Sequence, residues 1–593
     1  MAKKIKSKKM QGGLFFTMRL FFFNAKKYIW HIIFCLLAVI IGVCCTTSLA
    51  SVMANIIDIG VNKFDLKYIV NHGLIMIGLG LCGILCGAIN IYFSAYVTQN
   101  CAFDLRKKVF DKIQEFEFKN IDKFSTASLI TRVTNDINNL QMTFMMMLRI
   151  SLQAPITIIF AFAMLIILDS QMALIILAVI PVFALVIFLI MRFAMPKFLA
   201  MQKMLDRMNK TVQEKLISIR LIKSFCRENF EQKKFNSVAD DLMFKSLKAF
   251  NIVIFTIPTM IFLLDFTTLI IWWIGGNKFL NSGLEIGKLS AFISYIFYIL
   301  FSVMMLSYII LLFARSKASS LRIREVIDEK VNYVIKEKNL DDTEKIKIDV
   351  LEFDKVNFKY TGDDKELVLK NISFKIERGE TLAIIGATSS GKSTLVNLIP
   401  RFFDINTGEI KINNKNIRDY DLNLLRNSIG FVMQKNILFS GSITENIKLG
   451  NRKADLKEIK KACEIAQAND FILNLKDKYE TELGQMGVNL SGGQKQRLCI
   501  ARAILKEPEI LILDDSTSAV DSLTEKKIYD GFDLVLKNKI KIIVAQRISS
   551  IKNADKIIVL DNGKICGIGK HEELLKENNI YREICESQNK LNE

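Results

Sequence analysis

The chain has 593 residues, of which 51% are hydrophobic and 24% are charged, and its mean hydropathy is +0.28. This length predicts several domains, the hydropathy excludes a purely soluble enzyme, and the charge content excludes a disordered or wholly membrane-embedded chain. The net charge is +20, of which +17 falls in residues 1–346 and +3 in residues 347–593. Because the excess accompanies the apolar half, it indicates a positive cytoplasmic membrane face and argues against nucleic-acid binding.

Six apolar stretches reach or nearly reach the roughly 20 residues that a membrane helix needs. Five of them contain no Asp, Glu, Lys or Arg, and the other is interrupted only by Asp265. The predicted spans are 28–57, 68–103, 150–168, 170–191, 249–277 and 289–314. The basic N-terminus is not followed by a short apolar core and a cleavage site, so we expect the first span to stay in the protein.

The connections between the spans predict their orientation. The short connections 58–67, 169 and 278–288 carry only four basic residues, whereas the N-terminus and the long segments 104–149 and 192–248 carry many more. By the positive-inside rule, the basic segments and the C-terminal half are cytoplasmic. Helical spacing of apolar residues in both long segments predicts stalks that extend about 30 Å from the bilayer. We therefore expect a multi-pass protein of a bacterial-type plasma membrane.

The pattern changes after the last span, where the chain loses apolarity and gains charge, as is typical of a linker. Short apolar runs then alternate with helical patterns, which predicts a buried parallel sheet in an α/β domain. The predicted strands are 382–385, 510–513, 542–544 and 557–560. The predicted domains are a cytoplasmic N-terminus (1–27), a six-helix transmembrane domain with two stalk segments (28–317), a linker (318–346) and an α/β domain (347–593).

A phosphate-binding loop follows the first of these strands and precedes a helix. Residues 386–393 read Gly-Ala-Thr-Ser-Ser-Gly-Lys-Ser and fit the pattern G-x-x-x-x-G-K-[ST]. Backbone N–H groups of such a loop cradle phosphates, its Lys reaches the β- and γ-phosphates, and its Ser hydroxyl binds Mg²⁺. The predicted ATP contacts here are Gly386, Ala387, Thr388, Ser389, Ser390, Gly391, Lys392, Ser393 and Thr394. Asp514 follows a buried strand, where an Asp would hold the metal.

Further motifs connect this loop to a known family. Leu490-Ser-Gly-Gly-Gln494 begins shortly before Asp514 and resembles the signature motif of ABC ATPases. Tyr360 occupies the position at which that family stacks an aromatic ring on adenine, and Gln434 follows Gly-Phe-Val-Met as in the family's Q-loop. Residues 517–521 resemble the D-loop, and residues 481–484 resemble a segment found in exporters. With six spans ahead of the ATPase, the chain resembles an ABC exporter half-transporter along nearly its whole length.

This resemblance implies a dimer in which two nucleotide domains enclose two ATP molecules with Mg²⁺. It places Ser393, Gln434 and Asp514 at the metal, and it directs Ser491, Gly492, Gly493 and Gln494 toward the nucleotide of the other subunit. Residues 118–132 and 214–227 resemble the family's coupling segments, although the family often has Gly where this chain has Ala127 and Ser218.

Two residues depart from the family pattern at the γ-phosphate. Asp515 stands where most active members have a Glu that acts on the attacking water, and Gln546 stands where they have His. A carboxylate withdrawn by one methylene loses reach to a water, and an amide cannot relay a proton as imidazole does. The candidate catalytic residues are thus Asp515, Gln546, Gln434 and Ser491. We expect this chain to bind ATP, to hydrolyse it slowly, and to pair with a second half-transporter that retains Glu and His.

The sequence leaves the transported substrate open. Asp265 and Arg149 lie in apolar surroundings, where a charge belongs to an ion pair, a watery cavity or a substrate contact. Met and Phe residues near them suit amphipathic drugs or lipids, and they equally suit ordinary helix packing; these residues are Met145, Met146, Met147, Phe297, Phe301, Met304 and Met305. Three interpretations remain: a heterodimeric exporter of hydrophobic or amphipathic compounds, a homodimeric lipid or peptide exporter, and an ATP-gated membrane sensor without productive turnover.

Overall fold

The computed structural model describes residues 25–282, 285–331, 344–360, 366–517 and 519–589. It consists of two compact units: a helical unit, formed by the chain up to Ile113 together with Ala127–Glu329, and a second unit formed by Gln114–Thr126 together with Lys330–Glu593. Nearly all of the predicted cytoplasmic N-terminus lies outside the described residues.

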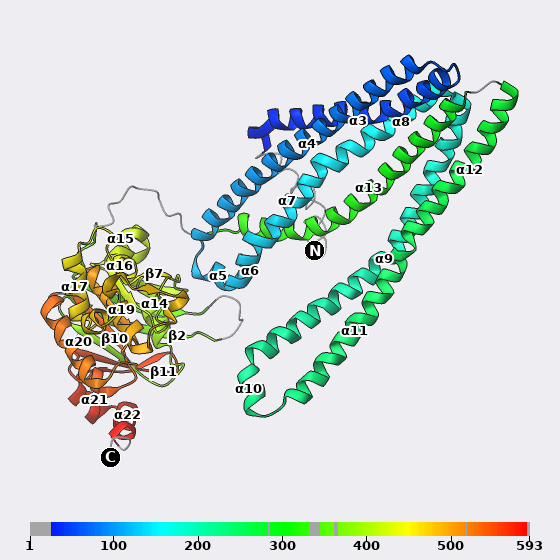
Figure 1. Cartoon of the computed structure of the whole chain (residues 1–593). Coiled ribbons are helices and arrows are strands. Elements are labelled where there is room, and N and C mark those ends of the chain that lie inside the picture. Colours follow the sequence, from blue (N-terminus) through cyan, green and yellow to red (C-terminus); the bar gives the residue numbers. More distant parts are fainter. Residues whose placement is uncertain (1–24, 283–284, 332–343, 361–365, 518, 590–593) are drawn as a thin grey trace. The chain divides into compact units, whose positions relative to one another are not determined.

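The helical unit confirms the six predicted spans. Within the described ranges, six helical stretches are long and apolar enough to cross a membrane. Their helices are α3 (Ile29–Asn55), α4 (Leu66–Gln114), α8 (Leu152–Leu168), α9 (Ser170–Ile217), α12 (Thr256–Ser282) and α13 (Ile286–Ile327) (Figure 1). The single residue Asp169 joins α8 to α9, and its carboxylate accepts hydrogen bonds from the first backbone N–H groups of α9. This cap explains why one residue suffices for the turn.

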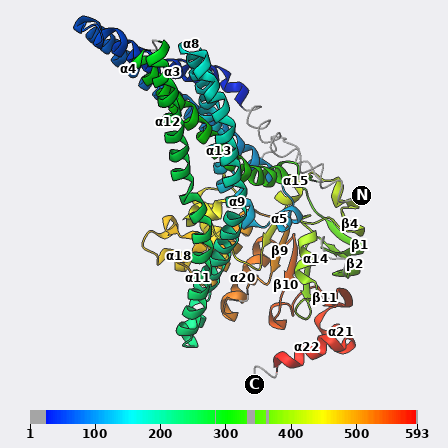
Figure 2. The ribbon, with the colours of Figure 1, turned by 90° about the vertical axis from the view of Figure 1, so that its right-hand side faces the viewer.

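The two long cytoplasmic segments are helical, as their spacing predicts. After α4, the first contains α5 (Phe118–Phe124), α6 (Thr126–Thr131), η3 (Arg132–Asp136), α7 (Ile137–Met146) and η4 (Met147–Ser151). The second continues α9 and returns through α10 (Ile219–Ser224) and α11 (Glu228–Ile254). Helices α9 and α11 run side by side along most of α11 (Figures 1 and 2).

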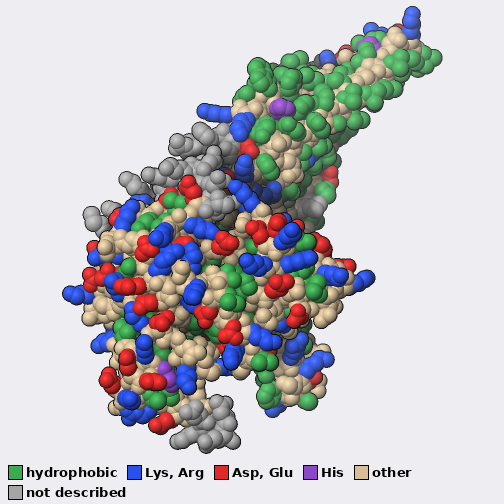
Figure 3. Space-filling view, turned by 90° about the vertical axis from the view of Figure 1, so that its left-hand side faces the viewer, with side chains coloured by type: hydrophobic (Ala, Val, Ile, Leu, Met, Phe, Trp, Pro, Cys, Tyr) green, Lys and Arg blue, Asp and Glu red, His purple; other side chains and the backbone are tan. Residues whose placement is uncertain are grey.

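Side-chain burial separates the inside of the helical unit from its surface. Ala161, Leu165, Ile176 and Phe292 are buried in a core that α8, α9 and α13 share, whereas Trp273 is 77% exposed. Hydrophobic side chains cover much of the helical unit in Figure 3, while Lys, Arg, Asp and Glu are interspersed over the other unit. An apolar exterior of this extent fits a lipid environment and not water.

Helix α13 continues ten residues into the segment predicted as a linker. Ile323 and Val326 are fully buried, and Arg322 forms an ion pair with Asp136, whose side chain is 1% exposed. The charges in this segment indicated a linker because the sequence does not show their partners. In the structure Arg322 neutralises the buried Asp136 carboxylate, and the helix continues to Ile327.

The second unit is α/β, as predicted, and contains two main sheets. One has the order β2-β1-β4-β5 and is antiparallel; its strands are β1 (Val350–Phe358), β2 (Leu369–Glu377), β4 (Thr407–Ile412) and β5 (Lys415–Asn416). The other has the order β12-β11-β3-β10-β9-β6; its strands are β12 (Lys564–Gly569), β11 (Lys556–Asp561), β3 (Thr381–Ile385), β10 (Ile540–Val544), β9 (Ile510–Asp514) and β6 (Ile429–Val432). All four predicted strands are present in this second sheet.

Helices and a short two-stranded ribbon complete this unit. The helices are α14 (Lys392–Leu398), α15 (Leu422–Asn427), α16 (Ile443–Lys448), α17 (Leu456–Ile465), α18 (Asn469–Leu473), α19 (Gly492–Leu505), α20 (Ser522–Val535), α21 (His571–Glu577) and α22 (Asn579–Asn589). The ribbon pairs β7 (Gly441–Ser442) with β8 (Glu482–Leu483). The unit also includes α5, in which the Phe118 ring lies 4.7 Å from that of Phe402 and 5.9 Å from that of Phe403.

Candidate nucleotide site

Four neighbouring parallel strands bring the predicted site residues together. Strand β10 pairs with β3 on one side and β9 on the other, and β9 pairs with β6, so the carboxyl ends of all four lie along one edge. Loops at such an edge are the usual ligand site of an open α/β sheet. Gly386, Gln546, Asp515 and Gln434 each follow one of these strands, and all four line a cavity of about 610 Å³.

The phosphate loop lines this cavity throughout, from Gly386 to Thr394. Gly391 has φ +101°, and a Cβ there would lie 2.9 Å from Leu369. A Cβ at Gly386 would lie 2.0 Å from the carbonyl oxygen of Leu560, so a larger residue could not approach this strand. Both glycines are therefore required for the shape of the loop, and Gly391 leads directly into α14.

Side chains at the base of the loop connect it to the end of β9. The Ser393 hydroxyl donates to Asp514 Oδ1 at 3.0 Å, which places the two predicted metal ligands in contact. The Lys392 ammonium donates to the carbonyl oxygens of Gly386 and Ala387, at 2.9 and 2.8 Å. Burial lowers the pKa of Lys392, against the effects of the Asp515 and Asp514 carboxylates. Burial likewise raises the pKa of Asp514, against the hydrogen bond from Ser393.

The loop satisfies a simple test for a phosphate group. Ser390 Oγ is buried and has no hydrogen-bond partner among the described residues. A phosphate oxygen could accept the hydrogen bond that this hydroxyl donates. The N-terminus of α14 also favours negative charge beside it. The donors of the loop therefore fit a nucleotide phosphate.

Asp515 and Gln546 contact each other in the lining of the cavity. Gln546 Nε2 donates to Asp515 Oδ2 at 2.8 Å, and the Gln434 side chain also hydrogen-bonds this carboxylate. Asp515 has φ +48°, a left-handed conformation that a short Asp tolerates. Burial raises the pKa of Asp515, while Gln434 and the Lys392 ammonium act in the opposite direction. The carboxylate thus lies between two neutral amides.

Tyr360 lies beside the loop and not among the residues that line the cavity. The residue is 39% exposed, and its hydroxyl lies 3.1 Å from Thr394 Oγ1, so a hydrogen bond connects the ring to α14. The ring meets Phe403 edge to face at a centroid distance of 5.1 Å. A partly exposed ring held in this way could accept a stacked base.

The signature residues occupy the N-terminus of α19. The Ser491 hydroxyl accepts a hydrogen bond from Gln494 N, and the Gln494 side chain accepts one from Ser491 N, which forms a reciprocal capping box. Gly493 packs so closely against Ala519 that a Cβ would lie 2.8 Å from the Ala519 carbonyl oxygen. These residues do not line the cavity of the phosphate loop, so within one chain they are separate from it.

The membrane candidates lie in the helical unit. Asp265 is exposed on α12, where no ion pair with another described residue involves it, and Arg149 is half-buried in η4. The rings of Phe297 and Phe301 stack at 6.2 Å on an exposed face of α13. Met145, Met146 and Met147 are half-buried near the junction of α7 and η4.

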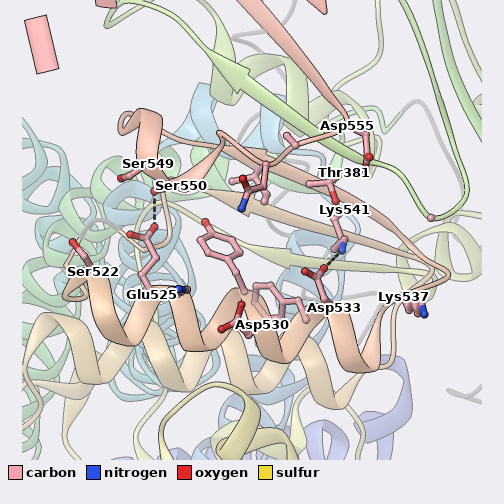
Figure 4. A pocket seen from close by; sticks show the side chains of 17 residues that line it. Thr381, Ser522, Glu525, Asp530, Asp533, Lys537, Lys541, Ser549, Ser550 and Asp555 are labelled. Carbon is pink, nitrogen blue, oxygen red and sulfur yellow. Dashed lines mark hydrogen bonds and ion pairs between the residues drawn. The ribbon is translucent and has the colours of Figure 1, made fainter. Parts of the chain in front are cut away.

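The structure adds two features that the motifs do not indicate. Helix α22 contributes Glu583 and Gln588 to the cavity of the phosphate loop. A second cavity, of about 700 Å³, lies beside α20, where the buried Glu525 accepts hydrogen bonds from Thr517 Oγ1 at 2.6 Å and from Ser550 Oγ at 2.7 Å (Figure 4). Glu525 therefore joins the segment after Asp515 to the segment after Gln546. No motif marks α22 or Glu525 itself. The available signals are the apolar spacing of α22 and the D-loop segment, which contains Thr517.

Comparisons with known proteins agree with this geometry. Residues 32–304 match the family description "ABC transporter transmembrane region", and residues 369–518 match "ABC transporter". The chain is 39% identical over 536 residues to the uncharacterized ABC transporter ATP-binding protein YfiB of Bacillus subtilis, covering 90% of this chain and 92% of the relative. It is 35% identical over 505 residues to YgaD of the same organism, provisionally named a multidrug export ATP-binding/permease protein, covering 84% and 85%.

Its fold also resembles a solved structure. A bacterial Atm1-family ABC exporter with ATP bound aligns with a TM-score of 0.79 at 23% identity, covering 94% of this chain and 99% of that one. The two family matches follow each other in one polypeptide, in the order of the six spans and the α/β unit. The chain therefore belongs to the ABC transporters, as an integral membrane protein that carries its transmembrane region and its cytoplasmic ATPase in one polypeptide.

Proposed function

We propose that this subunit forms one half of a heterodimeric exporter, that it binds Mg-ATP, and that its own ATP site turns over slowly. One observation carries the proposal: the Asp515 carboxylate is held between the amides of Gln546 and Gln434. An attacking water needs a carboxylate within hydrogen-bond reach, and the short Asp515 side chain already accepts from two protein donors. Neither amide can take up or relay a proton at neutral pH.

Nucleotide binding does not depend on these two departures. Lys392 and the N–H groups of the phosphate loop would hold the phosphates, and Tyr360 would support the base. Ser393, Gln434 and Asp514 would hold Mg²⁺, which neutralises charge on the transferring phosphate when it is bound. The contact between Ser393 and Asp514, at 3.0 Å, supports this assignment because both ligands already lie together.

The intact signature supports a second role for the chain. Ser491 caps α19 and presents the positive end of a 14-residue helix. Since this end lies apart from the chain's own phosphate loop, its donors would serve a nucleotide held by the other subunit. A partner that retains Glu and His would then hydrolyse ATP in a site that this chain completes.

The tip of the second stalk supports dimerisation. Apolar side chains in and around α10 are exposed: Leu216 by 67%, Ile217 by 76%, Leu221 by 59% and Phe225 by 68%. By contrast, Phe118 of α5 packs on aromatic rings of the ATPase in the same compact unit. An apolar tip in the cytosol requires a cover. The ATPase of the second half-transporter is the cover that we propose.

The proposed substrates are hydrophobic or amphipathic compounds. Exposed Phe297, Phe301 and Met304 on α13 form an apolar, adaptable surface. The provisional name of YgaD, which refers to multidrug export, agrees with this class. A homodimeric lipid or peptide exporter remains the alternative, and an ATP-gated sensor would need the same slow site.

Steady-state ATP hydrolysis tests the proposal. The full chain is purified alone and after coexpression with a candidate partner, in lipid nanodiscs, and its oligomeric state is verified. Slow hydrolysis alone together with rapid, substrate-stimulated hydrolysis in the pair is the expected result. Rapid Mg-ATP hydrolysis by a verified homodimer would show that the site is competent and that the homodimeric alternative is correct.

A further inference from the structure

Helix α22 is fixed to the ATPase along one face. Tyr581 is fully buried, and its hydroxyl lies 2.7 Å from His571 Nδ1; Cys585 is 6% exposed. Gln588 follows on the same face, because it lies seven residues after Tyr581 and three after Cys585. Ile580 and Ile584 pack against the same core, and both also line the nucleotide cavity. The helix therefore closes one side of that cavity.

The Gln588 side chain hydrogen-bonds the backbone on both sides of Arg547. Its Nε2 donates to the carbonyl oxygen of Gln546 at 2.7 Å, and its Oε1 accepts from the N–H of Ile548 at 2.9 Å. A primary amide is the side-chain group that offers a neutral donor and an acceptor side by side. The two bonds thus clamp the peptide segment from Gln546 to Ile548.

This clamp acts where the sheet no longer supports the chain. Strand β10 ends at Val544, and Gln546 and Arg547 are exposed. The side-chain amide of Gln546 nevertheless reaches Asp515 Oδ2 at 2.8 Å. A side chain beyond a strand end points reproducibly in one direction only if its own backbone is held, and the two bonds from Gln588 supply that restraint.

We propose that Gln588 is a positioning residue of the ATP site, which acts through Gln546 to distinguish ATP from ADP. The inference rests on the proposed function in one respect: it takes the γ-phosphate to lie near Gln546. The hydrogen bonds of Gln588 go to the backbone of Gln546 and Ile548, and we expect its effect on nucleotide binding to require the Gln546 side chain. ADP lacks the γ-phosphate, and its affinity should not depend on either residue.

Photolabelling of the transporter with 8-azido-ATP tests this inference. The two subunits are resolved on a gel, and the label on this chain is competed by a non-hydrolysable ATP analogue or by ADP. For Gln588→Ala we expect the analogue to bind about threefold to tenfold more weakly, the size of one lost hydrogen bond, while ADP affinity stays within about twofold. Gln588→Glu, which keeps the acceptor but loses the donor, should show the same sign. Glu586→Ala, an exposed change on the same helix, should alter neither affinity.

A double-mutant cycle separates positioning from general support of the fold. In a Gln546→Ala background, Gln588→Ala should cause no further change in the ratio of analogue to ADP affinity. The inference is overturned if Gln588→Ala weakens ADP as much as the analogue, or if it lowers the ratio by the same factor in both backgrounds. Failure of the proposed slow turnover would instead appear as rapid hydrolysis by the unmodified chain, which this binding ratio does not measure.

Discussion

The two ends of the nucleotide site are built in different ways. At the phosphate-loop end, one continuous segment, from Gly386 to Thr394, supplies the lining, and backbone geometry at two glycines fixes its shape. The other part of the site, which we call the switch end, consists of Gln434, Asp515, Gln546 and Gln588. These residues come from four separate segments and meet through side-chain hydrogen bonds. The shape of the first end is fixed by local sequence, because backbone groups dominate it and a Cβ at either glycine would clash. The second can be retuned by single substitutions.

This difference suggests how one subunit of a transporter could lose turnover and keep binding. Replacing a Glu and a His at the switch end leaves the glycines, Lys392 and Ser393 unaffected. ATP would still be held between subunits, and the signature of this chain would still complete the other site. Substitutions at the two ends should therefore have separable effects on binding and turnover.

The largest expected effect lies outside this chain's own cavity. Ser491→Arg should lower the steady-state ATPase rate of the coexpressed heterodimer by about 10²- to 10³-fold, because it removes a donor aimed at developing charge. Asp515→Asn should lower it only modestly, since we propose that this carboxylate is too short to serve as an efficient base. Near-normal turnover in Ser491→Arg together with abolished turnover in Asp515→Asn would contradict the asymmetric two-site mechanism.

Next in size is the loss of the phosphate-loop ammonium. Lys392→Ala should weaken ATP binding to this chain about tenfold to a hundredfold, the range expected when a charge-assisted hydrogen bond to phosphate is lost. Photolabelling of this subunit with 8-azido-ATP measures it, with Lys564→Ala on the exposed face of β12 as the matched control. Equal ATP affinity of the Lys392 variant and the unmodified chain would show that ATP binding does not depend on the phosphate-loop end.

Restoring Glu and His at the switch end should raise the rate of hydrolysis and leave ATP affinity unchanged. Asp515→Glu combined with Gln546→His should raise single-turnover hydrolysis at this site by about tenfold or more, because a longer carboxylate regains reach and imidazole regains proton transfer. ATP affinity should stay near that of the unmodified chain, since the phosphate loop is unaltered. Rapid-quench measurement with radiolabelled ATP provides both quantities. Unchanged turnover would locate the defect elsewhere in the site.

The smallest expected effect concerns acid stability and not the nucleotide. Burial acts to raise the pKa of Glu509, but its bonds with Lys539 and the charge of Arg378 hold this pKa below its usual value. A carboxyl with a lowered pKa contributes stability above its ordinary pKa of about 4.3 and loses it as the pH falls through the folded value. Glu509→Gln should therefore flatten the decrease in Tm below about pH 4.5, by a few degrees, in thermal denaturation. Parallel curves for the two proteins would contradict this assignment.

The sequence predicts the phosphate-loop end almost completely, for a physical reason. Its requirement is a run of small residues and one Lys between a strand and a helix, and these follow one another in the chain. The six spans and the parallel sheet are likewise predictable, since apolar runs of the right length report local burial. The signature Ser491 also follows from its motif, and the structure shows that this Ser caps α19.

The switch end is only half predictable. Asp515 and Gln546 could be identified because they replace known residues, but Gln588 lies in an amphipathic C-terminal helix that carries no motif. The continuation of α13 beyond its predicted span is not predictable from the sequence either. Its charged last turns indicate a linker until the distant Asp136 is known to pair with Arg322. Long-range polar contacts are specified by the three-dimensional fold, and local patterns do not contain them.

The contact of α5 with the ATPase has one further consequence. Phe118 touches Phe403, and Phe403 in turn meets Tyr360, the ring proposed to support adenine. Binding equilibria that share a structural element obey thermodynamic reciprocity. If a transported compound shifts α5 and thereby changes the nucleotide affinity by some factor, then the nucleotide must change the affinity for that compound by the same factor. Such a bound compound would thus change the nucleotide affinity of the ATPase before any bond in ATP is broken.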